Sequence, residues 1–452
     1  MSDVSLSALP SVDSAAVGAD AACEFVLLGM PDVNGSVRGK ALRPGAFDAA
    51  LQSGAVMTDL LLALDPTDTP ITAYERFGLR SGAGDLVVTP DPSTLRELSW
   101  LPGWRICLCT PSWPDGSPCE LSSREALRRA LDQMTAQGYA AKAAFEYEVR
   151  LRDETHAPLS SGISYSLGEI SRFERFVAQL VPALEALDVD LSAIHTEAGP
   201  GLLELNIGAR NGLRAADDAV FVKLAVKEVA ASMGLHASFL AKTHPGEEGS
   251  SGHVHLSCWS DGTNVFAPGR SGDGAADPGA LPALFSAALA GILEHLPAAS
   301  LMLNPTINSY KRLVPGFFAP VNVSWGLENR SCAVRAIRGA EPGRWRIECR
   351  RPGADANPYL ALAALVACAA DGMARAATPP APIVGDASER TDLPSLPGSL
   401  ESALGAFDAD EDFRRLIGPV FCDYYRTSRA WELAAWRDSV SDWERERYER
   451  AV

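Results

Sequence analysis

The chain has 452 residues, 47% of them hydrophobic and 21% charged, with a formal net charge of -17. This length predicts two or three domains with a large core, and the acidity argues against nucleic acids or anionic membranes as partners. The nine scattered cysteines form no C-x-x-C pair, the first residues form no secretion signal, and no apolar run has the length of a membrane span, so we expect a cytoplasmic protein with reduced, buried thiols.

The N-terminal part of the chain predicts a tail followed by a small strand-rich domain. Residues 1–20 are mostly Ser, Ala, Asp and Val without a clear period, which indicates a mobile tail. Strands expected at 23–28 and 36–42 flank a turn at 31–35, which is a hairpin pattern. Apolar runs follow at 56–64, 85–89 and 105–109. We assign residues 21–117 to this first domain.

Residues 118–452 predict a second, larger domain that mixes strands with helices. Ser122 to Glu125 form a capping-box pattern, and the helix that follows is expected to end at Gly138. Further helices are expected at 218–233 and 279–297. Asn357-Pro358 predicts the start of a core helix that is apolar almost all round and reaches about residue 376. After an exposed loop at 377–398, helical segments are expected at 400–407, 410–417 and 428–450.

Four segments of the second domain bring together side chains that can bind metals. On a strand, residues two apart share a face, so the F-E-Y-E segment presents two carboxylates together and S-G-H-V-H-L-S presents two imidazoles. A single pair of acids usually lies on a solvated face, and a single histidine is usually a core residue. Four such segments in one chain favour a metal-binding site. Five carboxylates and one histidine suit Mg²⁺ or Mn²⁺. They are Glu146, Glu148, Glu197, Glu204, Glu348 and His253.

The stretch 304–352 is rich in arginine although the protein is acidic. In R-I-E-C-R, Arg346, Glu348 and Arg350 would share one strand face, although a plain surface strand reads the same way. Guanidinium groups bind phosphate and carboxylate through paired hydrogen bonds, so the stretch predicts an anion site. The arginines are Arg312, Arg330, Arg335, Arg338, Arg344, Arg346, Arg350 and Arg351.

These segments, read in order with N-P-T-x-N-S-Y-K-R-L-V-P-G and N-R-S-x-x-x-R, resemble the glutamine synthetase family over nearly the whole chain. The resemblance implies an α+β fold, with an N-terminal β-grasp domain and a catalytic domain built as an antiparallel strand funnel flanked by helices. It implies that ATP phosphorylates the γ-carboxylate of glutamate and that a nitrogen nucleophile then displaces phosphate. It also implies a homododecamer of two stacked hexamers, in which each N-terminal domain completes a neighbour's site.

The same resemblance implies roles for individual residues, with two or three Mg²⁺ or Mn²⁺ ions in each active site. The first metal site would use Glu148, Glu197 and Glu204. The second would use Glu146, His253 and Glu348. The expected contacts to nucleotide and phosphate are His255, Ser257, Arg335 and Arg346. The expected contacts to glutamate are Gly249, Arg312, Arg330 and Arg350, and the expected catalytic group is Arg312, Arg330, Arg335 and Phe318.

Two departures from the family pattern concern the nitrogen nucleophile. Ammonia-using members carry P-G-Y-E-A-P in the flap loop, whereas Phe318 stands here at the position of that glutamate. They also carry F-D-G-S-S in the N-terminal domain, where this chain has residues 56–63, and the sequence leaves open whether Thr58 or Asp59 replaces the aspartate. A separate departure concerns the glutamate contact: Glu248, beside Gly249, stands where bacterial members commonly have asparagine. The L-L-x-A-x-D pattern resembles γ-glutamyl-amine ligases of amine catabolism.

We therefore expect an ATP-dependent ligase whose substrates are glutamate, ATP and a small primary amine. An unpaired ammonium in a pocket without carboxylates costs several kcal/mol, whereas each buried CH₂ of an amine gains about 0.8 kcal/mol. The alternative is an authentic glutamine synthetase, in which Phe318 merely packs and Asp59, Asp65 or Asp68 supplies the acid. A non-catalytic relative is disfavoured because every metal ligand is present.

Overall fold

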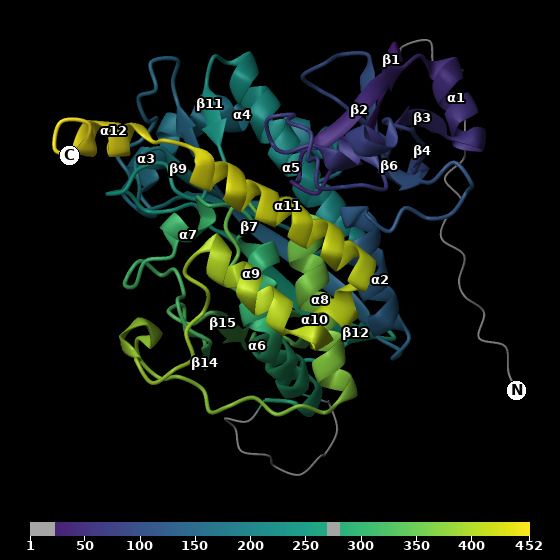
Figure 1. Ribbon diagram of the computed structural model, residues 1–452. Coiled ribbons are helices and arrows are strands. Elements are labelled where there is room, and N and C mark those ends of the chain that lie inside the picture. The colour runs from purple at the N-terminus through teal and green to yellow at the C-terminus, as the bar shows by residue number, and fades with distance from the viewer. Residues whose placement is uncertain (1–22, 269–280) are drawn as a thin grey trace, which may run out of the picture.

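The computed structural model describes residues 23–268 and 281–452, so the tail expected at 1–20 lies outside the described residues. A smaller sheet is formed by the N-terminal segment, and a larger sheet with most of the helices forms the rest of the body (Figure 1). This arrangement confirms the α+β fold. The division near residue 118 stays a prediction; it falls between the last strand of the small sheet and the helix that begins at Ser123.

The small sheet has the strand order β2-β1-β6-β4-β3, with β5 added beside β6. Strands β1 and β2 form the predicted hairpin, β1 and β6 run parallel, and the remaining pairs are antiparallel. Helix α1 (Pro44–Ser53) buries Phe47 and Ala50, giving the expected β-grasp arrangement. The strands are β1 (Phe25–Pro31), β2 (Val37–Leu42), β3 (Ala55–Thr58), β4 (Asp85–Pro90), β5 (Arg96–Glu97) and β6 (Trp104–Ser112).

The large sheet has the order β14-β15-β16-β12-β7-β9-β8, with β10 and β11 beside β7 and β13 beside β12. Every pair is antiparallel except β14 and β15, which run parallel. The strands are β7 (Ala140–Arg152), β8 (Leu191–Thr196), β9 (Leu202–Ile207), β10 (Arg210–Asn211), β11 (His236–Ser238), β12 (Gly252–Ser260), β13 (Thr263–Asn264), β14 (Trp325–Leu327), β15 (Val334–Ile337) and β16 (Arg346–Cys349).

The register of this sheet brings the predicted ligands together. His253 on β12 lies opposite Glu146 on β7, and Glu148 on β7 lies opposite Glu204 on β9. On the other side of β12, His255 lies opposite Glu348 on β16. Because directly opposed residues stand about 5 Å apart, the pairing of β9, β7, β12 and β16 concentrates acids and imidazoles on one face.

Helices α6 (Ala283–Leu303) and α8 (Pro358–Ala374) form the centre of the core. A Cβ atom at Gly291 would lie 2.2 Å from the Cys368 carbonyl oxygen, so the two backbones touch where only glycine fits. Helix α6 is long and apolar enough to cross a bilayer, but 78% of that apolar window is buried inside the fold. It is therefore a core helix, and α8 confirms the buried helix expected from Asn357 onward.

Several predicted helix ends were wrong. Helix α2 (Ser123–Thr135) starts at the predicted Ser122 cap but ends before Gly138, and α5 (Gly212–Ser232) begins earlier than residue 218. Helix α6 continues through Pro297 because both sides of that proline are buried. The single helix expected at 428–450 is instead α11 (Pro419–Asp438) and α12 (Asp442–Tyr448), since Ser441 caps a new helix.

The remaining helices cover the flanks of the large sheet and the core helices. Helix α11 crosses the body, and α12 projects from it towards the C-terminus (Figure 1). The N-terminal segment is tied to α11, because the Tyr74 hydroxyl donates to the Tyr424 carbonyl oxygen and the Tyr424 hydroxyl to the Leu62 carbonyl oxygen, each at 2.8 Å. These helices are α3 (Leu167–Ile170), α4 (Glu174–Ala186), α7 (Ser309–Arg312), α9 (Leu400–Ala409) and α10 (Glu411–Ile417).

Candidate active site

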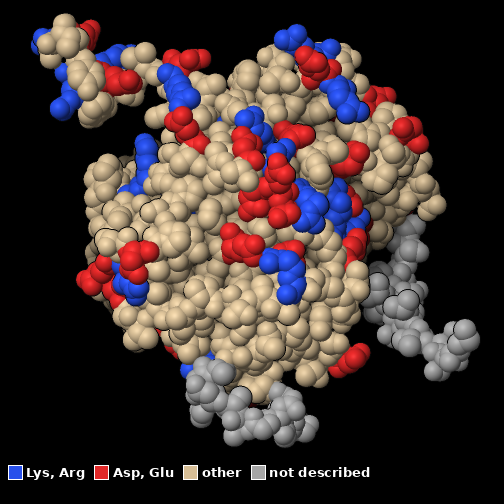
Figure 2. Space-filling view, turned by 60° about the horizontal axis from the view of Figure 1, so that its bottom comes forward, with Lys and Arg blue, Asp and Glu red and all other residues tan. Residues whose placement is uncertain are grey.

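A cavity of about 720 Å³ opens beside the central strands of the large sheet. On one face of the molecule, acidic and basic side chains gather in a central group surrounded by wide uncharged areas (Figure 2). The cavity is lined by most of the residues that the sequence predicted for the site. They are Glu146, Glu148, Glu197, Glu204, Gly249, His253, Arg312, Phe318, Arg330, Arg335, Glu348 and Arg350.

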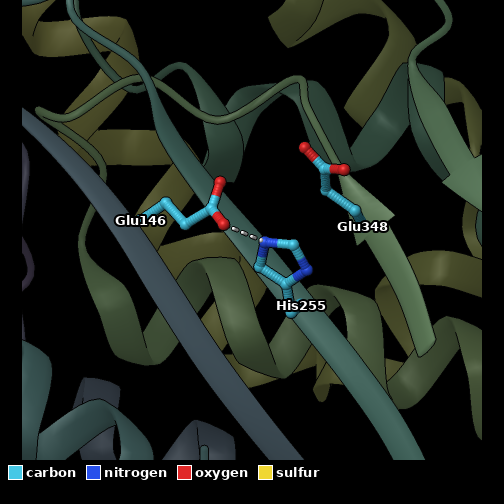
Figure 3. Close-up of side chains that lie close together, drawn as sticks. All are labelled: Glu146, His255 and Glu348. Atoms are coloured by element: carbon cyan, nitrogen blue, oxygen red, sulfur yellow. Dashed lines mark ion pairs between the residues drawn. The ribbon is translucent and has the colours of Figure 1, made fainter. Parts of the chain in front are cut away.

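One group of possible metal ligands is built on β7, β12 and β16. Glu146, His255 and Glu348 point toward one another, each offering an atom within 4.8 Å of the others (Figure 3). His255 Nε2 lies 2.9 Å from Glu146 Oε1. His253 Nδ1 lies 3.6 Å from both Glu146 Oε2 and Glu348 Oε1. The structure thus adds His255, expected at the nucleotide, to the group in which His253 was the expected ligand.

A second group lies at the other side of β7. Glu197 and Glu204 close around His195, whose Nε2 is 2.9 Å from Glu197 Oε1 and 3.6 Å from Glu204 Oε1. Glu148, the third expected ligand, accepts a hydrogen bond of 2.6 Å from the Ser251 backbone amide. The Tyr165 ring stacks on His195 with centroids 4.1 Å apart.

The sequence interpretation missed His195, although a signal was present. His195 and Glu197 are two residues apart at the end of β8, so the H-T-E spacing is the same alternation that revealed Glu146 and Glu148. Tyr165 also lines the cavity and was not foreseen. It lies in the chain far from any of the motifs, so only the fold shows its place.

The electrostatics of both groups fit divalent cations. Burial, together with the charges of Glu148 and Glu146, raises the pKa of Glu204 to about 8. Burial of Glu348 is outweighed by His255, Arg350 and His253, which lower the pKa of that carboxyl to about 2. Carboxylates held this close repel one another unless a positive charge lies between them, and oxygen and imidazole ligands in this number suit hard cations. The residues present therefore fit divalent metal ions.

Three arginines of the cavity have buried donors without a partner among the described residues. The Nε–H groups of Arg312, Arg335 and Arg350 donate no hydrogen bond there. Their other donors are fixed: Arg350 Nη1 lies 2.5 Å from Glu348 Oε1, and Arg335 Nη1 lies 3.0 Å from Glu348 Oε2. Buried donors are normally satisfied, so these atoms indicate a place for carboxylate or phosphate oxygens. Arg330 lines the same cavity and is exposed.

Comparison with known proteins agrees with this geometry. The profile described as "Glutamine synthetase, catalytic domain" matches residues 120–448. The chain belongs to the glutamine synthetase family. It is 35% identical over 442 residues to glutamate–isopropylamine ligase of a Pseudomonas species, covering 94% of this chain and 95% of that protein.

Two further matches come from a curated relative and a solved structure. Gamma-glutamylethanolamide synthetase of Streptomyces coelicolor is 32% identical over 442 residues, covering 94% of this chain and 93% of that protein. The solved structure titled "Apo GmaS without ligand" superimposes with a TM-score of 0.82 at 26% identity, covering 95% of this chain and 97% of that one. The family predicted from the sequence motifs is thereby confirmed.

The flap loop of this glutamine synthetase family member presents aromatic side chains to the cavity. Phe317 and Phe318 both line it, and Phe318 is 67% exposed. Phe318 has a φ of +51°, a left-handed conformation that is unfavourable for a residue with a side chain. The ammonium group of Lys242 lies over the Phe317 ring, 5.6 Å from its centroid. Phe318 is therefore not buried within its own chain.

The three aspartates considered as substitutes for the family's ammonium-site acid have local partners. Asp59 is 6% exposed, and its Oδ1 accepts a hydrogen bond of 3.1 Å from the Gly78 amide. Asp65 Oδ1 accepts from the backbone amides of residues 67 and 69. Asp68 pairs with Arg38. None of the three lines the cavity in this chain.

The other residues expected at the nucleotide lie beside the cavity and do not line it. Arg346 Nε donates to His255 Nδ1 at 3.1 Å. Ser257 Oγ accepts from Trp259 Nε1 at 2.9 Å. Both stand on strands that carry candidate metal ligands, β16 and β12, and their contacts to a nucleotide stay predictions.

Proposed function

We propose that this protein is an ATP-dependent ligase that joins the γ-carboxylate of glutamate to a primary amine. The products would be a γ-glutamylamide, ADP and phosphate. The observation that carries this proposal is Phe318, which lies exposed at the cavity where ammonia-using relatives have a glutamate. The names of the two curated relatives, which act on isopropylamine and form an ethanolamide, support the same class of reaction.

In the first step, the γ-carboxylate of glutamate attacks the γ-phosphorus of ATP, and γ-glutamyl phosphate and ADP form. The glutamate substrate would be bound by Arg312, Arg330 and Arg350. Gly249, which has no side chain, would leave space for the substrate. Arg335 would neutralise charge on the transferred phosphoryl group, since its unpartnered Nε is available to a phosphate oxygen. His255, Ser257 and Arg346 are the proposed nucleotide contacts.

The two acidic groups give this step its cation requirement. Glu148, Glu197 and Glu204 on one side, and Glu146, His253 and Glu348 on the other, fit two or three Mg²⁺ or Mn²⁺ ions. When bound, such ions screen the triphosphate and withdraw charge from the phosphorus. The side chains themselves hold fixed positions because strands β7, β9, β12 and β16 are paired along the sheet.

In the second step, the amine loses its ammonium proton and its nitrogen attacks the carbonyl carbon of the acyl phosphate. The C–N bond forms, the C–O bond to phosphate breaks, and a second proton leaves the nitrogen for solvent. The flap would cover the intermediate and exclude water, with Phe317 and Phe318 facing the organic substituent of the amine. An authentic glutamine synthetase would need a carboxylate at the flap to hold ammonium, and Phe318 supplies none. We therefore propose that the enzyme prefers primary amines to ammonium as the nucleophile.

We also propose a homododecamer of two stacked hexamers in the cytoplasm. Trp436 and Trp443, at the end of α11 and on α12, are 53% and 60% exposed, which leaves apolar surface for a neighbouring subunit. All nine cysteines are buried and free, which fits a reducing compartment. A fully active monomer in light scattering would disprove the assembly.

The function is tested by phosphate release with glutamate, ATP, Mg²⁺ and a panel of amines that includes ammonium. We expect at least one primary amine to exceed ammonium in kcat/KM by about tenfold or more, equivalent to about 1.4 kcal/mol. If ammonium is better than every amine, the enzyme is a glutamine synthetase. Absence of phosphate release with every nucleophile would show a non-catalytic relative.

A further inference from the structure

A ligase for amines must first bind a cation, because primary amines are protonated at neutral pH. A carboxylate is the natural partner for that ammonium group. Phe318 removes the carboxylate from the flap, and Asp59, Asp65 and Asp68 already have local partners and do not line the cavity of their own chain. An acid that lines the cavity within this chain is therefore a candidate partner for the amine.

Glu248 meets this requirement. It lines the same cavity as Phe317 and Phe318, and no described side chain or backbone donor pairs with its carboxylate. The other acids of the cavity belong to the two metal-binding groups or pair with arginine. Glu248 is thus the cavity acid that is left over when the metal ligands have been assigned.

The loop that carries Glu248 is rigid. Arg150, whose side chain is 1% exposed, donates from Nη2 to the Glu248 carbonyl oxygen at 2.6 Å and pairs through Nη1 with Glu247 Oε2 at 3.0 Å. Two residues later, the Ser250 amide donates to the Ala241 carbonyl oxygen at 2.8 Å. These contacts fix the backbone on both sides of Glu248, so its side chain starts from a fixed point at the cavity wall.

The charges that act on Glu248 come from Lys242 and from two acids of the proposed metal-binding groups. Burial raises its pKa, Lys242 opposes that rise, and Glu148 and Glu197 add to it. Lys242 in turn lies over the ring of Phe317. An incoming ammonium group at this position would relieve the repulsion between Glu248 and the nearby acids.

We propose that the Glu248 carboxylate binds the ammonium group of the amine substrate, while Phe317 and Phe318 contact its organic substituent. This inference rests on the proposed amine ligase activity and names the residue that recognises the amine. It moves the acid from the flap, where the family's ammonia-using members carry it, to the opposite loop beside Gly249.

The test compares wild type with Glu248→Gln, Glu248→Asp and the exposed control Glu154→Gln. Each enzyme is assayed with ethylamine, isopropylamine and ethanolamine, and separately with hydroxylamine, which is mostly uncharged at neutral pH. We expect Glu248→Gln to raise KM for the best alkylamine at least about tenfold and to change KM for glutamate and hydroxamate formation by less than about twofold. Glu248→Asp keeps the charge and should recover most of the loss, and Glu154→Gln should match wild type.

Two results would overturn the proposal. One is an unchanged KM for alkylamines in Glu248→Gln. The other is that Glu248→Gln raises the KM for glutamate and leaves the KM for alkylamines unchanged, which would show that Glu248 binds the α-ammonium group of glutamate. Thermal unfolding of each variant is measured in parallel, and collapse of Glu248→Gln would show a structural role and also refute the assignment.

Failure of the proposed function gives a different pattern. In that case wild type itself prefers ammonium to every amine, whatever the variants do. Comparing Glu248→Gln with wild type on ammonium and on hydroxylamine then tests Glu248 alone. A loss of activity with ammonium but not with hydroxylamine supports Glu248 as the cation-binding acid. Unchanged activity of the variant with both nucleophiles refutes that role.

Discussion

Gly249 lies directly against the side chain of Arg312. A Cβ atom at residue 249 would stand 2.2 Å from Arg312 Cγ and 2.7 Å from the Ala241 carbonyl oxygen. Arg312 itself is 4% exposed, and its Nη2 donates to the carbonyl oxygens of Arg351 at 2.6 Å and Pro352 at 3.1 Å. The absence of a side chain at Gly249 is therefore what lets the arginine reach the cavity.

We expect Gly249→Ala to displace Arg312 and lower kcat/KM for glutamate at least about a hundredfold, or about 2.7 kcal/mol. Steady-state kinetics with glutamate varied would measure this. Gly246→Ala is the matched control in the same loop, because its Cβ would meet its nearest neighbour, His244 Nδ1, at an ordinary 3.6 Å. Equal activity of the two variants would show that Arg312 does not bind glutamate.

The two metal-binding groups make a second prediction. Glu348→Ala removes a carboxylate that also pairs with Arg335 and Arg350, and Glu148→Ala removes one from the other group. Each change should abolish more than about 99% of turnover, equivalent to about 3 kcal/mol of transition-state stabilisation. The assay is phosphate release after chelation and refilling with Mg²⁺, with the surface variant Glu154→Ala as control. Turnover near wild type in either variant would contradict the ligand assignment.

The periodicity of the strands predicted which side chains share a face, but not which strands pair. Glu146 with Glu148, and His253 with His255, follow from the two-residue repeat alone. The register that sets His253 opposite Glu146 depends on long-range pairing of β7 with β12, which the sequence does not specify. The register also brings His255 beside Glu146 and Glu348, a neighbourhood that the two-residue repeat alone does not specify.

The helix ends show which sequence signals were overlooked and which were outweighed by tertiary packing. The break between α11 and α12 was readable, because S-D-W-E at Ser441 is a capping box, and both of its hydrogen bonds form. The continuation of α6 through Pro297 was not readable, because burial against α8 compensates for the hydrogen bond that proline cannot make. Tertiary packing decided that end.

A third prediction concerns His295, which joins α6 to the start of α10. Its Nδ1 lies 2.8 Å from Asp410 Oδ2, and its Nε2 lies 3.6 Å from Asp371 Oδ2, a carboxylate that also pairs with Arg375. Burial lowers the pKa of His295, but Asp410, Glu294 and Asp371 together raise it above its ordinary value. The surrounding acids thus favour the charged form of the imidazole.

The sign of the pH dependence follows from that raised pKa. The contribution of His295 to stability is complete below the unfolded pKa, about 6.5, and is lost as the pH rises through the folded value. At pH 6, we expect the free energy of unfolding of wild type to exceed that of His295→Gln by about 2 kcal/mol, so that wild type unfolds at a higher temperature. This difference should shrink towards pH 9. Thermal unfolding across this range measures it, with His236→Gln on exposed β11 as control. A constant difference would show that His295 contributes packing alone.

The last prediction concerns Phe318, which separates the two enzymatic interpretations. An amine gains affinity from apolar contact with Phe318, whereas ammonium has no substituent to place there. Phe318→Glu should therefore narrow the ratio of kcat/KM for the best alkylamine over ammonium by at least about fivefold, mainly by weakening the amine.

The gain for ammonium in Phe318→Glu should be modest, because residues 56–63 also differ from the family's F-D-G-S-S segment. Phe318→Leu is the matched control: with φ at +51°, leucine and glutamate meet similar backbone strain, but leucine keeps the apolar contact. Competition between ammonium and the amine panel is the measurement. If Phe318→Glu leaves the ratio as it is in wild type and in Phe318→Leu, the flap does not select the nucleophile, and the preference for amines must arise elsewhere in the cavity.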